Sequence, residues 1–317
     1  MKILRRSSLF VALAFELVLC FGTNSTAIAQ NKPSGESHFT KLDGARIHYV
    51  NYGKSDEALI LIHGWTQNTD AWRDNIPDFV SGYRVIAIDL PGHGKSDKPD
   101  EANSKGKNAK GRNDRNPTGT LYSMDHFARA VEAVMRDAKV KRAVLVGHSM
   151  GTPVARQFYR KYPDKTLAIV IVDGSLRPFG NKAMLDQMIA GFRGPGYRDA
   201  VTQMMAMISG PNLSAEVKER INASSNNTPQ YVLVGAMEGM ADASIWGEDK
   251  INVPVLAIMA KTPILPPNVE ESFRAIAPTM DFRLWEGVGH FVMMEKPKEF
   301  NAAVLQWLER NELLKKK

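Results

Sequence analysis

The stretch AVLVGHSMGTPVARQFYRK, residues 143–161, joins a short apolar run to a helix-like pattern through a serine flanked by glycines. The run predicts a buried strand over residues 143–146, and the pattern predicts a helix over residues 152–161. Gly147-His148-Ser149-Met150-Gly151 lies between them with the G-x-S-x-G spacing of a nucleophile elbow, in which a sharp turn exposes a serine hydroxyl. Only very small residues tolerate the close backbone approach at its two glycines. We therefore expect Ser149 to be a nucleophile, and the N-terminus of the following helix favours negative charge beside it.

Several other apolar runs predict strands, most of them covered on both faces. They alternate along the chain with helix-like patterns, which is typical of a parallel sheet packed between helices. The predicted strands span residues 45–52, 58–62, 83–88, 143–146, 168–172 and 253–259, and the predicted helices span residues 124–138, 152–161, 269–276 and 297–311. The sequence therefore predicts an α/β fold with a doubly wound, mostly parallel sheet.

The stretch from about residue 176 to residue 249 interrupts this alternation. It contains no convincing buried strand, and glycine and proline separate several amphipathic patterns. We interpret it as a helical insertion between two core strands. The predicted organisation is a core over residues 38–175 and 251–317, with the insertion over residues 176–250.

The first 29 residues have the pattern of a secretory signal peptide. Lys2, Arg5 and Arg6 precede an apolar run over residues 7–21, and small residues follow at 27–29 in an A-x-A arrangement. A membrane anchor is the alternative, but a spanning helix needs about 20 apolar residues and this run is shorter. We therefore expect cleavage after residue 29, no stable membrane anchor in the mature protein, and a periplasmic or secreted location.

The composition is that of an ordinary globular protein, with 44% hydrophobic residues, 24% charged residues and a formal net charge of +7. Cys20 is the only cysteine and lies in the predicted signal peptide, which excludes a disulfide, a thiol nucleophile or a cysteine-based metal site in the mature chain. Basic residues gather in residues 100–119 without interleaved aromatics. We interpret that segment as a solvated loop and not as a surface for nucleic acid.

A serine needs a neighbouring general base to act as a nucleophile. His290 fits this role because it follows the last strand-like run and lies after the serine, as the chain order Ser…Asp/Glu…His requires. His148 adjoins Ser149, but consecutive residues at a tight turn point apart. For His93, in a glycine-rich loop, a turn-stabilising role is the better interpretation. Three more histidines lie in strand-like or helix-like sequence and are expected to be structural: His38, His48 and His126.

The segment His63-Gly64-Trp65 follows the predicted strand over residues 58–62. In that position the backbone N–H of Trp65 can serve as one donor of an oxyanion hole, and the N–H of Met150 can serve as the other. Loss of one such donor typically costs about 2.7–4 kcal/mol of transition-state stabilisation. This loop therefore matters as much for catalysis as the nucleophile and its base.

Four motifs occur in a fixed order, namely H-G-W at 63–65, D-L-P-G-H-G-K-S-D at 89–97, G-H-S-M-G at 147–151 and G-H-F…E-K-P at 289–297. Together they resemble the α/β-hydrolase fold superfamily, in the branch that includes small esterases, lactonases, cofactor-free haloperoxidases and carbon–carbon bond hydrolases. The resemblance implies that the insertion is a helical cap over the active site and that no cofactor is needed. It also implies that Ser149 is the nucleophile, His290 the base, and Trp65 and Met150 the oxyanion donors. It is specific for fold and unspecific for substrate.

The triad acid is where this sequence departs from the family pattern. The family usually carries an aspartate after the strand that follows the cap, and Thr262 stands there. Asp173, at the end of the predicted strand over residues 168–172, is the alternative, because some members take the acid from that earlier strand end. Weaker candidates lie at the end of the cap: Asp242, Glu248 and Asp249.

The sequence as a whole predicts a serine hydrolase that cleaves an ester-like bond of a small molecule through an acyl-enzyme. Ser149 in place of an aspartate argues against epoxide hydrolysis and dehalogenation, which need a carboxylate nucleophile. Two alternatives stay open. One is carbon–carbon hydrolysis or perhydrolysis by the same triad, and the other is a non-catalytic ligand-binding protein of the same fold. The substrate and the oligomeric state are left undetermined.

Overall fold

The structure of the protein is a computed structural model that describes residues 34–100 and 121–316. These residues belong to one unit, Pro33–Lys317. The predicted signal peptide over residues 1–29 lies outside the described residues, as does nearly all of the basic loop over residues 100–119, and both remain predictions. Within the two described ranges, no helix combines the length and apolar character needed to cross a membrane.

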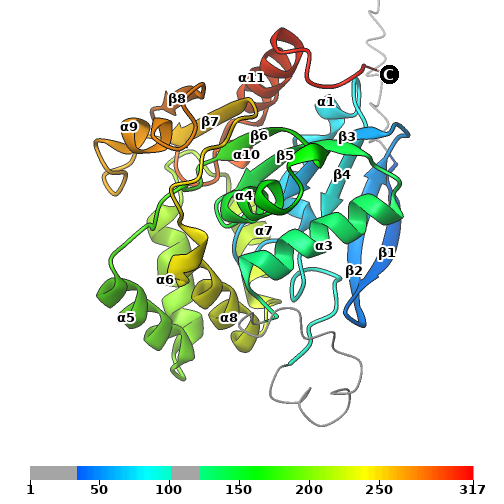
Figure 1. Cartoon of the computed structure of the whole chain (residues 1–317). Helices are drawn as coiled ribbons and strands as arrows, with labels where there is room; N and C mark the ends of the chain where they lie inside the picture. Colours follow the sequence, from blue (N-terminus) through cyan, green and yellow to red (C-terminus); the bar gives the residue numbers. More distant parts are fainter. Residues whose placement is uncertain (1–33, 101–120, 317) are drawn as a thin grey trace, which may run out of the picture. The chain divides into compact units, whose positions relative to one another are not determined.

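Eight strands form one sheet, and their bounds are β1 (Glu36–Leu42), β2 (Ala45–Tyr52), β3 (Glu57–Ile62), β4 (Val85–Ile88), β5 (Arg142–His148), β6 (Thr166–Val172), β7 (Val255–Ala260) and β8 (Asp281–Trp285). The order across the sheet is β1-β2-β4-β3-β5-β6-β7-β8 (Figure 1). The pairs β1–β2 and β2–β4 are antiparallel. The remaining pairs are parallel, which confirms the predicted mostly parallel sheet.

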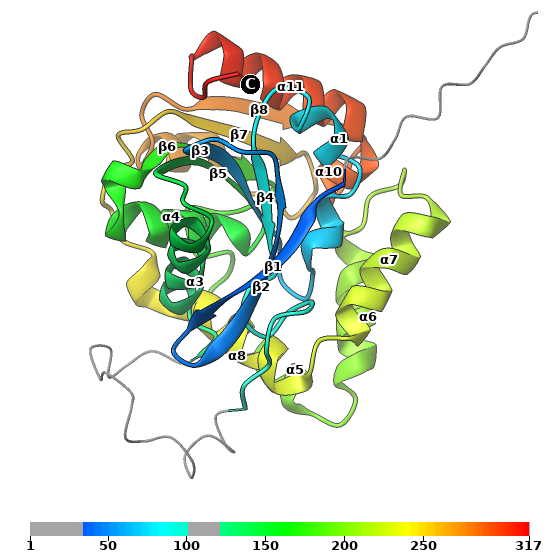
Figure 2. The same cartoon turned by 90° about the vertical axis from the view of Figure 1, so that its right-hand side faces the viewer.

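Helices cover both faces of this sheet. On one face lie α3 (Met124–Asp137) and α4 (Gly151–Lys161), and on the other lie α1 (Ile76–Phe79), α10 (Val292–Glu295) and α11 (Pro297–Arg310) (Figures 1 and 2). Every residue of β3 and β7 is buried as a result, in agreement with their continuous apolar sequence. The core therefore lies on both sides of the central strands.

Four helices form the cap, between β6 and β7. They are α5 (Lys182–Arg193), α6 (Tyr197–Ile208), α7 (Ala215–Asn226) and α8 (Gln230–Ala241), and they lie together at one end of the sheet (Figure 1). Local capping explains where two of them begin, because the side chain of Asn181 accepts the Met184 N–H and that of Ser214 accepts the Val217 N–H. The helical insertion between core strands is thus confirmed.

A few elements differ from the sequence prediction. Strand β1 was not among the predicted runs, because most of its side chains are exposed and its sequence is largely polar. Strand β4 begins at Val85, two residues later than expected. The remaining elements are short: η1 (Thr69–Trp72), η2 (Pro163–Lys165), η3 (Ala243–Ile245) and α9 (Val269–Arg274).

The carboxyl ends of the parallel strands meet along one edge of the sheet. The segments at the ends of β3, β5, β6 and β8 carry the H-G-W motif, Ser149 of the G-H-S-M-G motif, Asp173 and His290, in that order. Loops at this edge are where α/β sheets bind their ligands, because neighbouring strand ends place side chains from distant parts of the chain together.

Candidate active site

Ser149 lies in the turn between β5 and α4 with its side chain half-buried. Its φ of +51° is in the left-handed region, which costs an L-residue roughly 1–2 kcal/mol. Two backbone hydrogen bonds hold it there: the Ser149 N–H donates to the Val172 carbonyl at 3.0 Å, and the Ser149 carbonyl accepts the Thr152 N–H at 2.9 Å. This is the strained strand-to-helix turn that the sequence predicted.

The glycines of the motif are required by close backbone contacts. A methyl group at Gly147 would lie 2.4 Å from the Gly151 carbonyl oxygen, and one at Gly151 would lie 2.4 Å from the Ile62 carbonyl oxygen. Gly174, directly after Asp173, is equally constrained, since a methyl group there would lie 2.0 Å from Thr152 Oγ1. The ends of β3, β5 and β6 are therefore in direct contact around the elbow.

His290 and Asp173 are brought together although 117 positions separate them in the sequence. Nδ1 of His290 lies 2.6 Å from Oδ2 of Asp173, and only 21% and 12% of the two side chains are exposed. A carboxylate can only accept, so Nδ1 carries a proton and Nε2 is left with a lone pair. The other carboxylate oxygen accepts the Ala260 N–H at 2.7 Å, which anchors Asp173 to the end of β7. Asp173 itself adopts a φ of +42°.

The other carboxylates considered from the sequence are engaged elsewhere. Asp242 caps η3 by accepting the Ser244 N–H at 2.9 Å, and Glu248 pairs with Arg177 in the loop after β6. Asp249 accepts from Nε of Arg160 at 2.8 Å. Of the candidates, only Asp173 therefore contacts the His290 ring.

The loop after β3 passes directly against the elbow. A methyl group at Gly64 would lie 3.1 Å from Cβ of Ser149, so the Gly64–Trp65 peptide adjoins the nucleophile. Within the described part of the chain, neither the N–H of Trp65 nor that of Met150 donates to another backbone group. Two free N–H groups beside Ser149 are what an oxyanion hole requires.

His148 holds the backbone of His290. Its Nε2 lies 2.9 Å from the His290 carbonyl oxygen and must donate to it, and the two rings are 4.8 Å apart. Burial lowers the pKa of His148 well below its ordinary value, with the neighbouring His290 as a second cause. His148 is therefore a neutral support that ties the histidine loop to the elbow, and the expectation that it is not the base agrees with this contact.

Two further histidines are buried beneath the site. His63 accepts the Leu90 N–H at Nε2, at 3.0 Å, so its proton is on Nδ1, which contacts the Gly64 carbonyl at 2.8 Å. The His93 ring lies 5.0 Å from that of His63. Burial lowers the pKa of His63 and lowers that of His93 to about 3. Both are neutral supports of their loops, as proposed for His93.

Glu295 is a site residue that we did not single out from the sequence, although it lies in the E-K-P motif. Its Oε1 accepts the Gly289 N–H at 2.8 Å, directly before His290. The His290 N–H in turn donates to the Ile208 carbonyl of the cap at 2.9 Å. Burial raises the pKa of Glu295. The histidine loop is therefore held by the core, by the elbow and by the cap.

A second Ser–His–Asp chain of contacts begins at the exposed Ser37 of the edge strand β1. Oγ of Ser37 is 2.9 Å from Nε2 of His48, and Nδ1 of His48 is 2.7 Å from Oδ2 of Asp89. The Asp89 carboxylate also accepts backbone N–H groups of Thr69 and Lys95. Because Ser37 lies on a regular strand and not at a strand-to-helix turn, it has no helix N-terminus beside it. We therefore assign this trio a structural role, joining β1 and β2 to the loop after β4.

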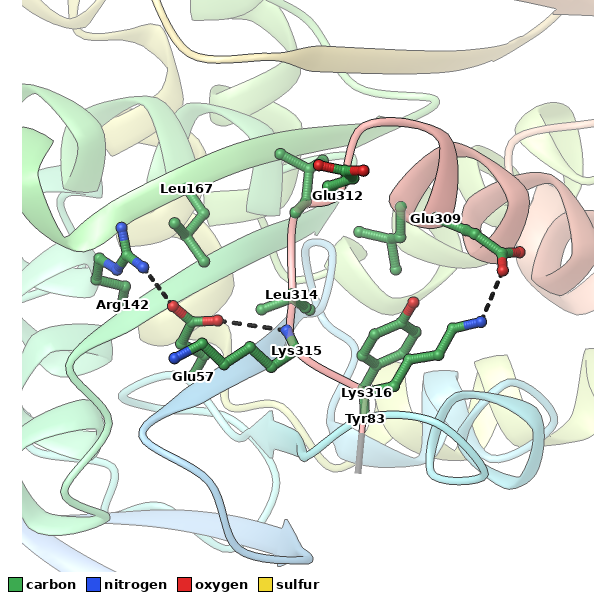
Figure 3. A pocket seen from close by; sticks show the side chains of 11 residues that line it. Glu57, Tyr83, Arg142, Leu167, Glu309, Glu312, Leu314, Lys315 and Lys316 are labelled. Atoms are coloured by element: carbon green, nitrogen blue, oxygen red, sulfur yellow. Dashed lines mark hydrogen bonds and ion pairs between the residues drawn. The ribbon is translucent and has the colours of Figure 1, made fainter.

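A surface hollow of about 400 Å³ lies at the opposite end of the sheet. It is lined by Glu57 and Arg142, the first residues of β3 and β5, by Leu167 near the start of β6, and by the C-terminal segment with Leu314 (Figure 3). Arg142 begins β5 and Ser149 follows its end, so roughly 20 Å of strand separates the two regions at about 3.3 Å per residue. The Glu57 and Arg142 side chains pair with each other. This hollow is separate from the Ser149 site.

Comparison with known proteins gives a family match over most of the chain. The sequence model of the alpha/beta hydrolase fold matches residues 57–297. Over 130 residues the chain is 32% identical to epoxide hydrolase 1 of Caenorhabditis elegans, which covers 41% of this chain and 28% of that protein.

Solved structures agree with this match at the level of the fold. An N-acyl homoserine lactone degrading enzyme is similar with a TM-score of 0.71 and 24% identity, over 85% of this chain and 100% of the other. An esterase from Exiguobacterium antarcticum is similar with a TM-score of 0.73 and 17% identity, over 86% of this chain and 100% of the other. At these identities the likeness shows the fold alone.

Proposed function

The chain belongs to the α/β-hydrolase fold family, and from this premise we propose that it is a serine hydrolase acting on an ester-like bond. The substrate is a carboxylester or a lactone of a small molecule, and the reaction passes through an acyl-enzyme on Ser149. The observation that carries the proposal is the 2.6 Å contact between His290 Nδ1 and Asp173 Oδ2, beside a serine in a strained elbow.

This contact supports general-base catalysis because it fixes the tautomer of the imidazole. With the Nδ1 proton directed at Asp173, Nε2 is unprotonated and can take the proton of Ser149 as its oxygen attacks the substrate carbonyl. The nearby carboxylate then stabilises the imidazolium that forms. His290 next delivers this proton to the leaving group, and the bond between the carbonyl carbon and the leaving oxygen breaks.

The second half of the reaction repeats the first with water. His290 takes a proton from water as the water attacks the acyl-enzyme, and it returns that proton to Ser149 as the acid product leaves. In both halves negative charge develops on the carbonyl oxygen, and we assign the N–H groups of Trp65 and Met150 to stabilise it.

The nature of the nucleophile favours this chemistry over that of the epoxide hydrolase relative. Epoxide opening on this fold uses a carboxylate nucleophile, whereas a serine hydroxyl suits attack on a carbonyl carbon. The similarity to an esterase and to a lactone-degrading enzyme indicates that this fold accommodates ester chemistry. Carbon–carbon hydrolysis and perhydrolysis would use the same triad, so product analysis has to separate them.

The test is a substrate screen joined to active-site labelling. The chain should react stoichiometrically with a fluorophosphonate at Ser149 and should release acid and alcohol from short aryl esters or lactones, while Ser149→Ala should do neither. Labelling without ester turnover would favour the carbon–carbon or perhydrolase alternatives. A wild-type protein that does not label at all would refute the proposal and favour a non-catalytic member of the fold.

A further inference from the structure

The loop that carries the Trp65 N–H has a backbone conformation that its own residues do not favour. The Gln67 N–H donates to the Gly64 carbonyl at 3.1 Å, which closes a tight turn with Trp65 and Thr66 at its centre. Thr66 has a φ of +60°. A positive φ at this position is usually supplied by glycine, and a β-branched residue adopts it only when its surroundings impose it.

The surroundings that impose it come from the cap. Ser224, near the end of α7, donates from Oγ to the Thr66 carbonyl at 2.9 Å, and Thr228 Oγ1 lies 3.3 Å from the same oxygen. Ser225 Oγ lies 2.9 Å from the hydroxyl of Thr66. All four side chains are buried, with Thr66 fully covered. The same oxygen of Ser224 accepts from Nδ2 of Asn68 at 2.9 Å, so one cap serine holds the loop at two points.

The side chain of Trp65 is also anchored to the cap. The Trp65 indole N–H donates to the Leu233 carbonyl of α8 at 2.8 Å, and its ring lies 5.0 Å from that of Phe192 of α5. Hydrogen bonds from α7 and α8 thus bracket the peptide that faces Ser149. If Thr66 relaxed to a negative φ, the adjoining peptide would rotate and the turn carrying the Trp65 N–H would shift.

We propose that Ser224, assisted by Thr228, is a positioning residue: by holding the Thr66 turn, it aims the Trp65 N–H at the oxyanion. The cap is then a part of the catalytic machinery as well as a cover over it. This inference rests on the proposed serine-hydrolase function, because it concerns the same oxyanion hole.

The test uses the full-length protein and four substitutions, three at cap residues that contact the Thr66 turn and one at Thr66 itself. Ser224→Ala with Thr228→Val removes both donors to the Thr66 carbonyl. We expect kcat to fall about 10- to 100-fold with KM changed less than about twofold, because complete loss of one oxyanion donor costs about 10²- to 10³-fold in kcat. Ser225→Ala is the matched control, since Ser225 is about as buried on the same helix but its described hydrogen bond to the turn is to the Thr66 hydroxyl and not to the Thr66 backbone; kcat should stay within about threefold of wild type.

A rescue variant separates positioning from general damage to the cap. Thr66→Gly, added to Ser224→Ala/Thr228→Val, should recover most of the lost kcat, because glycine adopts a positive φ without being held there. Loss of kcat that glycine does not restore, or a double variant with wild-type kcat, would overturn the inference.

The rate of fluorophosphonate labelling at Ser149, measured in the same variants, distinguishes the two proposals. If the wild type labels and the double variant labels equally fast, the positioning role fails alone. If the wild type does not label, the proposed function fails and the positioning role fails with it.

Discussion

Replacement of Asp173 by asparagine is the most demanding test of the site, because the Asp173 carboxylate accepts hydrogen bonds from two donors at once. Its Oδ1 accepts the Ala260 N–H at 2.7 Å and its Oδ2 accepts the His290 Nδ1–H at 2.6 Å. Asparagine has a single carbonyl oxygen and presents an NH₂ group in place of the other acceptor. The backbone donor of Ala260 cannot change, whereas an imidazole can move its proton from one nitrogen to the other.

We therefore expect the asparagine oxygen to stay on Ala260 and its NH₂ group to donate to His290 Nδ1. The imidazole proton then moves to Nε2, which can no longer accept the proton of Ser149 in the proposed mechanism. The same exchange in a serine protease lowers kcat by about 10⁴-fold, which corresponds to about 5.4 kcal/mol of activation free energy at 1.36 kcal/mol per decade. Both hydrogen bonds are still made, so the free energy of unfolding should change by no more than about 1 kcal/mol.

The assay is the rate of aryl-ester hydrolysis together with the melting temperature. Thr262→Ala is the control, because that residue occupies the family's usual acid position without contacting His290 here, and its kcat should stay within about threefold of wild type. Thr262→Asp, combined with Asp173→Asn, should restore part of the activity from the neighbouring strand end. A loss smaller than about tenfold in a folded Asp173→Asn protein would refute the assignment of Asp173 as the triad acid.

Three further predictions follow from burial, close packing and the N-terminal sequence. Burial lowers the pKa of His93 to about 3, whereas in the unfolded chain this pKa is near 6.5. The contribution of His93 to the free energy of unfolding should therefore be fully present above pH 6.5 and fall by up to about 1.4 kcal/mol per pH unit below it. In urea unfolding measured over this pH range, the free energy of unfolding of His93→Gln should depend less steeply on pH than that of the wild type. Gly151→Ala should lower the free energy of unfolding by about 3 kcal/mol or prevent folding, because its methyl group would clash with the Ile62 carbonyl oxygen. Gly191→Ala, at an exposed position of α5 with open space around it, should raise the free energy of unfolding in the same urea measurement by about 0.5–1 kcal/mol. Exported protein should begin near Gln30 in N-terminal sequencing, and an exported chain that still starts at Met1 would contradict the predicted cleavage.

The elements that the sequence predicted well are those with strong local signals. The runs over residues 168–172 and 253–259 are continuous and apolar, and both became buried parallel strands, β6 and β7. The elbow was equally clear, because glycine, serine and glycine at fixed spacing reflect a backbone approach so close that a methyl group on either glycine would lie 2.4 Å from a carbonyl oxygen. Such features are encoded within a few residues, so a single sequence reveals them.

Contacts between residues far apart in the sequence were harder to predict. Asp173 could be proposed from the sequence only because Thr262 occupied the usual position, and no local pattern ties it to His290. No local pattern indicates a role for Glu295 or Ser224 either, because a glutamate in a short helix and a serine near the end of α7 have many ordinary roles. Their significance comes from the backbone groups that the fold places opposite them, at Gly289 and at Thr66.

The position of Asp173 shows how the fold limits where the proposed triad acid can lie. Val172 pairs with Ile258, and the Asp173 N–H donates to the Ile258 carbonyl at 2.9 Å, so β6 and β7 end side by side. Neighbouring strands lie only about 4.8 Å apart, and a carboxylate at either end can therefore reach the same imidazole nitrogen. What the reaction requires is an acceptor at that nitrogen, whichever strand supplies it. Asp173, which follows β6 in the left-handed conformation and accepts the Ala260 N–H at the end of β7, meets this requirement. Threonine at position 262 is therefore compatible with the proposed triad.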